Sequence, residues 1–158
     1  MNTLLARLAA VAQSAIAALE SLQPLAQLAA RLYVAQAFFA AGLTKIRNWD
    51  TTLALFEDEY HVPLLPPDVA ALLGTAGELV LPVLLALGLA GRFGALGLSV
   101  VNVVAVWSLA EIAPAALQQH VTWGVLLAGL AIHGVGRWSL DCALVAPALR
   151  ASKLGNQS

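Results

Sequence analysis

The chain has 158 residues, of which 60% are hydrophobic and 11% charged, and its formal net charge is −1. Soluble domains average about 25% charged residues, so this composition argues against a fold surrounded by water. The near-neutral charge gives no basic field for nucleic acid. The single cysteine, Cys142, excludes an internal disulfide and a CxxC redox pair. The length allows one domain, and the composition indicates a small integral membrane protein.

Residues 1–23 are predicted to form an amphipathic helix that lies in the membrane interface. Apolar residues recur on one helical face, and polar residues such as Arg7 fall on another. The segment lacks the basic start of a secretory signal, and Pro24 is expected to separate it from the first span. A weaker fifth span and a cleaved signal are the alternatives. The apolar face comprises Leu4, Leu8, Val11, Ala15, Leu19 and Leu22.

Four apolar stretches follow, at about 25–47, 68–90, 92–113 and 115–136. A helix needs about 20 apolar residues to cross the hydrocarbon core. Eighteen uncharged residues separate Arg92 from Glu111, and twenty-five separate Glu111 from Arg137. The sequence therefore predicts an all-α fold, a membrane-embedded four-helix bundle preceded by the amphipathic helix. The bundle domain spans 24–141, and a tail spans 142–158.

The distribution of Lys and Arg predicts the orientation of the bundle. Cytoplasmic ends of membrane helices carry an excess of these residues. With the N-terminus inside, five of them lie on the cytoplasmic side, Arg31 is within reach of that side, and only Lys45 and Arg47 lie outside. We therefore expect a multi-pass protein of the bacterial inner membrane with both termini cytoplasmic, and an outer loop, 48–67, that folds over the bundle mouth. The five cytoplasmic residues are Arg7, Arg92, Arg137, Arg150 and Lys153.

Glu78 lies near the middle of the second span. A charge there costs roughly 2.5–3.5 kcal/mol on insertion scales and usually faces a partner or a cavity. Side chains lean toward the N-terminus of their own helix, so Lys45 and Glu78 lean toward one another across a depth gap of about 12 Å. Lys45 is the favoured partner and Arg31 the alternative. An interhelical lock, a binding pocket and a proton-transfer group all remain open.

Other polar residues are expected to surround the outer mouth of the bundle. Lys45, Glu78, Trp49 and His120 form a candidate polar pocket, with Arg31 as a further candidate and His61 and Glu111 nearby. The histidines lack the spacing of a metal site, so none is predicted. Asn102, mid-way in the third span, is expected to bridge helices through its amide.

A second charged pair is predicted at the cytoplasmic end of the bundle. Asp141 would lie near Arg92, and an ion pair between them would tie the ends of the helices together. This role is structural rather than chemical.

Several of these segments together resemble the DoxX family of small bacterial membrane proteins over residues 25–141. They are Arg31, Gly42-Leu43-Thr44-Lys45, Glu78-Leu79, Pro82 to Leu89, Arg92 and Gly134 to Asp141. Val135 stands where the family usually has proline. The resemblance implies four membrane helices. Some relatives are linked to quinone-coupled oxidation of sulfur compounds or to membrane redox complexes, and the resemblance transfers no catalytic residue.

Three functions are compatible with these features. A quinone-linked redox subunit would use Lys45 as a donor and Glu78 as a proton carrier, with Tyr33, Trp49 or Trp107 against the ring. The sequence has no haem ligand pair, flavin fingerprint or cluster cysteines, so no cofactor other than a quinone is expected, and electrons would come from a partner or the substrate.

A non-catalytic anchor or assembly subunit is the first alternative, and a small transporter the second. The expected partners are the bilayer and a redox protein or a second copy.

Overall fold

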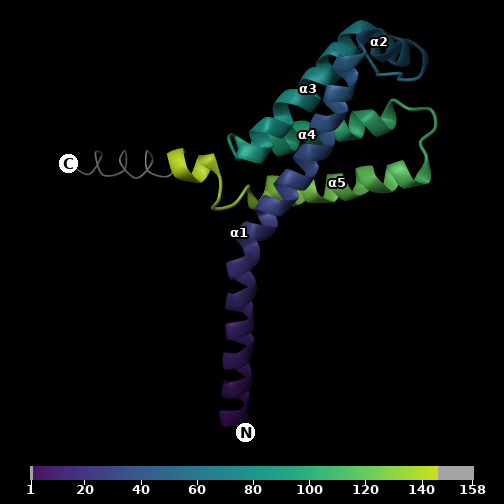
Figure 1. Cartoon of the computed structure of the whole chain (residues 1–158). Coiled ribbons are helices and arrows are strands. Elements are labelled where there is room, and N and C mark those ends of the chain that lie inside the picture. Colours follow the sequence, from purple (N-terminus) through teal and green to yellow (C-terminus); the bar gives the residue numbers. More distant parts are fainter. Residues whose placement is uncertain (1, 146–158) are drawn as a thin grey trace.

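The computed structural model describes residues 2–145, with side chains over 5–144, and the regular elements in this part of the chain are all helices. Figure 1 shows a bundle from which the first half of the first helix projects alone. The fold confirms the predicted all-α class. Residues 146–158 of the predicted tail lie outside the described part. The elements are α1 (Asn2–Arg47), α2 (Trp49–Asp58), α3 (Pro67–Leu87), α4 (Gly91–Trp107), α5 (Pro114–His133) and a π-helical turn η1 (Asp141–Val145).

Helices α1, α3, α4 and α5 form the four-helix bundle. By length and composition, three of them could cross a membrane: Leu5–Arg47 of α1, α3 and α5. The fourth, α4, is apolar but has only 17 residues, a length of about 25 Å. A core of buried apolar side chains joins α1, α3, α4 and α5. It includes Val34, Phe38, Leu85, Leu98, Leu127 and Leu130.

The third span is shorter than predicted, because α4 ends at Trp107 rather than near residue 113. The Ser108 carbonyl accepts a 2.8 Å hydrogen bond from the backbone N–H of His61, and Tyr60 and Leu109 form an isolated β-bridge. The chain after α4 therefore pairs with the segment after α2 instead of continuing as helix. This contact draws the predicted outer loop against the bundle.

Helix α1 passes through Pro24 without the expected break. A proline within a helix lacks the backbone donor and crowds the preceding turn, but here the helix continues on both sides. Before Pro24 the large apolar side chains are more than half exposed. The interfacial position of this half stays a prediction. The exposed residues are Leu5, Leu8, Val11, Ile16, Leu19 and Leu22.

The connection between α3 and α4 is held by Asp141, which does not form the predicted ion pair with Arg92. Gly88 ends α3 in the left-handed conformation (φ 65°). The Asp141 carboxylate then accepts 2.8 Å hydrogen bonds from the N–H groups of Ala90 and Gly91 at the start of α4. Free N–H groups and the helix dipole make this position favourable for an anion.

Arg92 acts at a different helix end. Its Nη2 donates to the carbonyl of Ile132, 3.4 Å away in the last turn of α5. The last turn of a helix has free carbonyl groups and the negative end of the helix dipole, so a cation is favoured there. Each charge of the predicted pair thus serves a separate helix terminus.

Helices α1 and α3 approach closely at Gly42. A Cβ atom at this position would lie 2.9 Å from Leu79 Cγ and 3.1 Å from Glu78 Cβ. The two helices therefore meet with residue 42 level with Glu78, and Lys45 lies only one turn further along α1. The expected depth gap of about 12 Å was too large, because this glycine contact sets the register between the helices.

A side chain at residue 42 should separate the two helices. We expect Gly42→Val to destabilise the protein by about 1–3 kcal/mol, the typical cost of overpacking. Gly129→Val is the matched control, since a Cβ at residue 129 would meet nothing within 4 Å. Thermal unfolding in detergent measures both variants. Equal losses of stability would contradict a specific α1–α3 contact.

Candidate functional site

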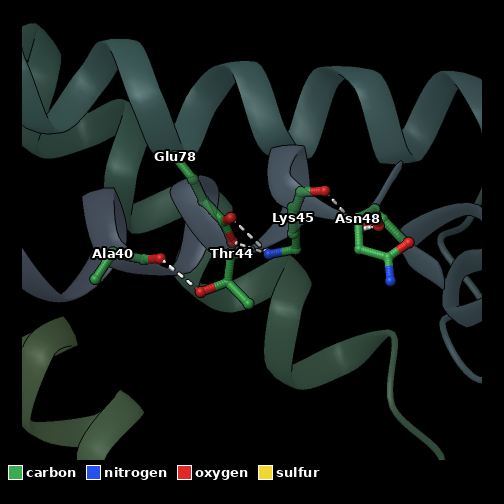
Figure 2. Close-up of polar contacts among 6 residues, drawn as sticks. Ala40, Thr44, Lys45, Asn48 and Glu78 are labelled. Atoms are coloured by element: carbon green, nitrogen blue, oxygen red, sulfur yellow. Dashed lines mark hydrogen bonds and ion pairs between the residues drawn. The ribbon is translucent and has the colours of Figure 1, made fainter. Parts of the chain in front are cut away.

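The centre of the site is an ion pair between Lys45 of α1 and Glu78 of α3. The Lys45 Nζ donates to Oε1 at 2.6 Å and to Oε2 at 2.5 Å (Figure 2). The side chains are 21% and 9% exposed. It is the one ion pair among the side chains that the structure describes. The predicted choice of Lys45 over Arg31 as the partner of Glu78 is confirmed.

The backbone carbonyl of Lys45 is held by a hydrogen bond from a residue in the first turn of α2. The Thr52 hydroxyl donates to the carbonyl of Lys45 at 2.9 Å and lies 3.1 Å from that of Asn48. The Asn48 side chain accepts from the N–H of Thr51 at 3.3 Å, capping α2. The Thr52 bond satisfies a carbonyl left free at the end of α1. The turn between α1 and α2 therefore holds the lysine in place.

Arg31, the alternative partner, lies at the opposite end of the bundle. It is fourteen residues before Lys45 in α1, a separation of about 21 Å. Its side chain is buried, and Nη2 donates to the carbonyl of Trp138 at 2.5 Å. Its Nε and Nη1 have no partner in the described part of the chain. Arg31 ties α1 to the segment after α5 and is not part of the candidate site.

A cavity of about 380 Å³ opens beside the ion pair. Lys45 and Glu78 contribute to its wall, and α4 and α5 form the other side. The loop after α2 contributes Tyr60, and the turn after α4 contributes Ser108. Most of the remaining lining is apolar. The site therefore combines an apolar interior with a few polar groups, the usual composition of a small-molecule pocket.

His120 of α5 belongs to this cavity and is bonded to Asn102 of α4. Its Nδ1 lies 2.8 Å from Asn102 Oδ1, and Asn102 Nδ2 donates to the His120 carbonyl at 3.0 Å. The predicted helix-bridging role of Asn102 is thus confirmed. The amide joins α4 to α5 and holds the imidazole at the same time.

Two aromatic rings near His120, from α1 and α5, also line the cavity. Trp123 makes edge contacts with His120 at 5.0 Å and with Phe38 at 5.4 Å between ring centroids. Its indole N–H is buried and has no hydrogen-bond partner among the described residues. Such aromatic surfaces offer a flat ligand a stacking partner.

Other predicted pocket residues lie elsewhere. Trp49 packs against a small cluster of Phe56, Ala70 and Ala71 that holds α2 on α3, and it does not line the cavity. His61 and Glu111 are exposed. Tyr33 and Trp107, proposed as ring partners, are 53% and 74% exposed on the outside of the bundle.

Four further residues line the cavity and were not predicted as site residues from the sequence: Phe38, Tyr60, Ser108 and Trp123. Trp123 could have been found, because it lies three residues after His120 and shares its helical face. Tyr60 and Ser108 lie in non-helical connections, where no periodicity indicates a direction. Burial raises the pKa of the Tyr60 hydroxyl, and the carboxylates of Glu78 and Glu59 raise it further. Tyr60 therefore remains a neutral phenol and can donate a hydrogen bond.

The ion pair should show strong thermodynamic coupling. Lys45→Met or Glu78→Met alone leaves one charge unpaired in an apolar setting, and we expect each to cost roughly 3 kcal/mol. The double variant leaves no charge and should cost less than either single change. Unfolding of the four proteins in one detergent gives the coupling energy. Additive losses would mean that the two side chains do not interact.

Comparisons with known proteins identify the family. The DoxX family model matches residues 26–111, more than half of the chain, and this range contains both Lys45 and Glu78. A relative from Haemophilus influenzae, described only as an uncharacterized protein, is 31% identical over 120 residues, covering 70% of this chain and 78% of the relative. No solved structure matches the chain. With its apolar helical bundle, the chain is a membrane protein that belongs to the DoxX family.

Proposed function

We propose that the cavity binds the headgroup of a membrane quinone, and that the protein acts as the quinone-binding subunit of a redox system. The observation that carries this proposal is the apolar, aromatic-walled cavity with the Lys45–Glu78 pair in its wall. A quinone headgroup is an apolar ring with an oxygen at each of two opposite edges. A site for it therefore needs apolar walls together with a few hydrogen-bonding groups. The resemblance to DoxX relatives that are linked to quinone-coupled oxidation also supports quinone binding.

The size and the hydrogen-bonding groups of the cavity suit such a ligand. Its volume of about 380 Å³ falls within the range of small-molecule pockets, about 300–1,000 Å³. A lysine ammonium has three N–H donors. Glu78 takes two of them, which leaves one for a quinone carbonyl, and the Tyr60 hydroxyl is a second donor on the same wall. The rings of Phe38 and Trp123 provide the apolar face for the headgroup.

We assign the supply of electrons to a partner. The sequence has a single cysteine and no haem or flavin motif. Glu78 is the residue placed to exchange protons with the bound headgroup, since it is a carboxylate in the cavity wall. Quinone reduction takes up two protons and two electrons, and this chain would contribute binding and proton exchange.

The exposed half of α1 favours a second function, that of an anchor or assembly subunit. Its large apolar side chains before Pro24 are more than half exposed. A redox partner or a second copy could pack on this half, and both functions would then coexist. Recovery of the protein in mild detergent without any stoichiometric partner would count against this second function.

The proposed orientation places α2, and the end of the bundle that holds the cavity, on the outer side of the bacterial inner membrane and both termini in the cytoplasm. Cys142 is free and exposed, so a membrane-impermeant maleimide should label it in inverted vesicles and not in intact spheroplasts. Cys142→Ser combined with His61→Cys should show the opposite pattern, because His61 is exposed near α2. Labelling of Cys142 in intact spheroplasts would reverse the orientation.

The quinone proposal predicts a specific loss of affinity. Titration of the purified protein with decylubiquinone should quench tryptophan fluorescence, since Trp123 lines the cavity. Lys45→Met removes a charged donor, and we expect affinity to fall about tenfold or more. Arg47→Met is the matched control, because Arg47 is exposed at the same end of α1. Unchanged affinity in Lys45→Met would remove the lysine from the binding site.

A further inference from the structure

The hydrogen bonds between Asn102 and His120 determine which imidazole nitrogen carries the proton. Asn102 Nδ2 donates to the His120 carbonyl at 3.0 Å, so the amide oxygen faces the ring. That oxygen lies 2.8 Å from His120 Nδ1 and can only accept. The proton of the neutral ring therefore resides on Nδ1.

The other ring nitrogen is then a free acceptor. With the proton on Nδ1, the neutral imidazole has a lone pair on Nε2. Nε2 has no hydrogen-bond partner in the described part of the chain, and His120 lines the cavity. The edge contact with Trp123 at 5.0 Å restrains the ring. Nε2 is thus an acceptor without a protein donor among the described residues, on a ring that lines the cavity.

An acceptor in the cavity distinguishes the two stable forms of a quinone. The oxidised form has carbonyl oxygens, which only accept hydrogen bonds and would leave Nε2 unpaired. The reduced form has hydroxyl groups, and one of them can donate to Nε2. The reduced form therefore makes a hydrogen bond that the oxidised form cannot make.

We infer that the cavity holds the reduced, hydroxyl-bearing form of the quinone more tightly than the oxidised form, with His120 Nε2 accepting the hydroxyl proton in a hydrogen bond. This inference rests on the proposed function and specifies which redox form the site selects. An unmade hydrogen bond in a buried site lowers affinity by about tenfold. A tenfold preference for the reduced form raises the two-electron potential of the bound couple by about 30 mV.

The test compares the affinities of one quinone in its two redox states. Decylubiquinone and its chemically reduced quinol are titrated anaerobically into the purified protein. We expect the wild type to bind the quinol about tenfold more tightly. His120→Phe keeps a ring against Trp123 but removes the acceptor, and it should abolish the preference with little change in quinone affinity. His120→Gln retains an acceptor oxygen and should keep part of the preference.

Two further variants complete the design. His133→Phe is the matched control, because His133 ends the same helix, does not line this cavity and is exposed. This variant should prefer the quinol over the quinone to the same extent as the wild type. Asn102→Leu leaves the imidazole but removes the group that fixes its proton, and it should reduce the preference. If His120→Phe does not fold, Asn102→Leu decides the question.

The outcomes separate the inference from the function on which it rests. If the wild type binds neither form, the proposed function fails and the inference with it. If the wild type binds the quinone and Lys45→Met weakens that binding, the function stands. A quinol preference that is absent from the wild type, or unchanged in both His120→Phe and Asn102→Leu, then overturns the inference alone.

Discussion

The ion pair between Lys45 and Glu78 is the interaction on which the rest of the site depends. An isolated carboxylate in the hydrocarbon region costs roughly 2.5–3.5 kcal/mol, and a hydrogen-bonded ammonium offsets that cost. The pair can form because Gly42 lets α1 approach α3 and because Thr52 holds the backbone of Lys45. Since the same two side chains form part of the cavity wall, the contact that stabilises the bundle also supplies its polar surface.

The two ends of the bundle use their charged groups differently. At the end near η1, Arg31, Arg92 and Asp141 all bind backbone groups: the first two donate to carbonyls, and Asp141 accepts from the N–H groups that begin α4. Arg92 and Asp141 satisfy peptide groups that helices leave free, and Arg31 binds a carbonyl in the connection after α5. At the end near α2, Lys45 and Glu78 bind each other beside an open cavity. This difference in surroundings distinguishes the residues assigned to structure from those assigned to binding.

The sequence predicted the helices and the central pair for identifiable reasons. Long apolar stretches indicate membrane spans because lipid tolerates few charges, and the lean of helical side chains favoured Lys45 as the partner of Glu78. The features that the sequence did not predict arise from tertiary contacts. The bond between His61 and Ser108 ends α4 early, and the free N–H groups of α4 bind Asp141. Tyr60 reaches the cavity from a connection whose path no periodicity reveals.

The most direct test of this account is the separation between the Lys45 ammonium nitrogen and the Glu78 carboxyl carbon in a lipid bilayer. The chain has only two lysines, at positions 45 and 153, so selective ¹⁵N labelling gives a simple solid-state NMR spectrum. Recoupling to ¹³C-labelled glutamate should show a direct ion pair at roughly 3–4 Å, and the signal should vanish in Glu78→Gln. A Lys45 signal without coupling to any carboxylate would contradict the central claim.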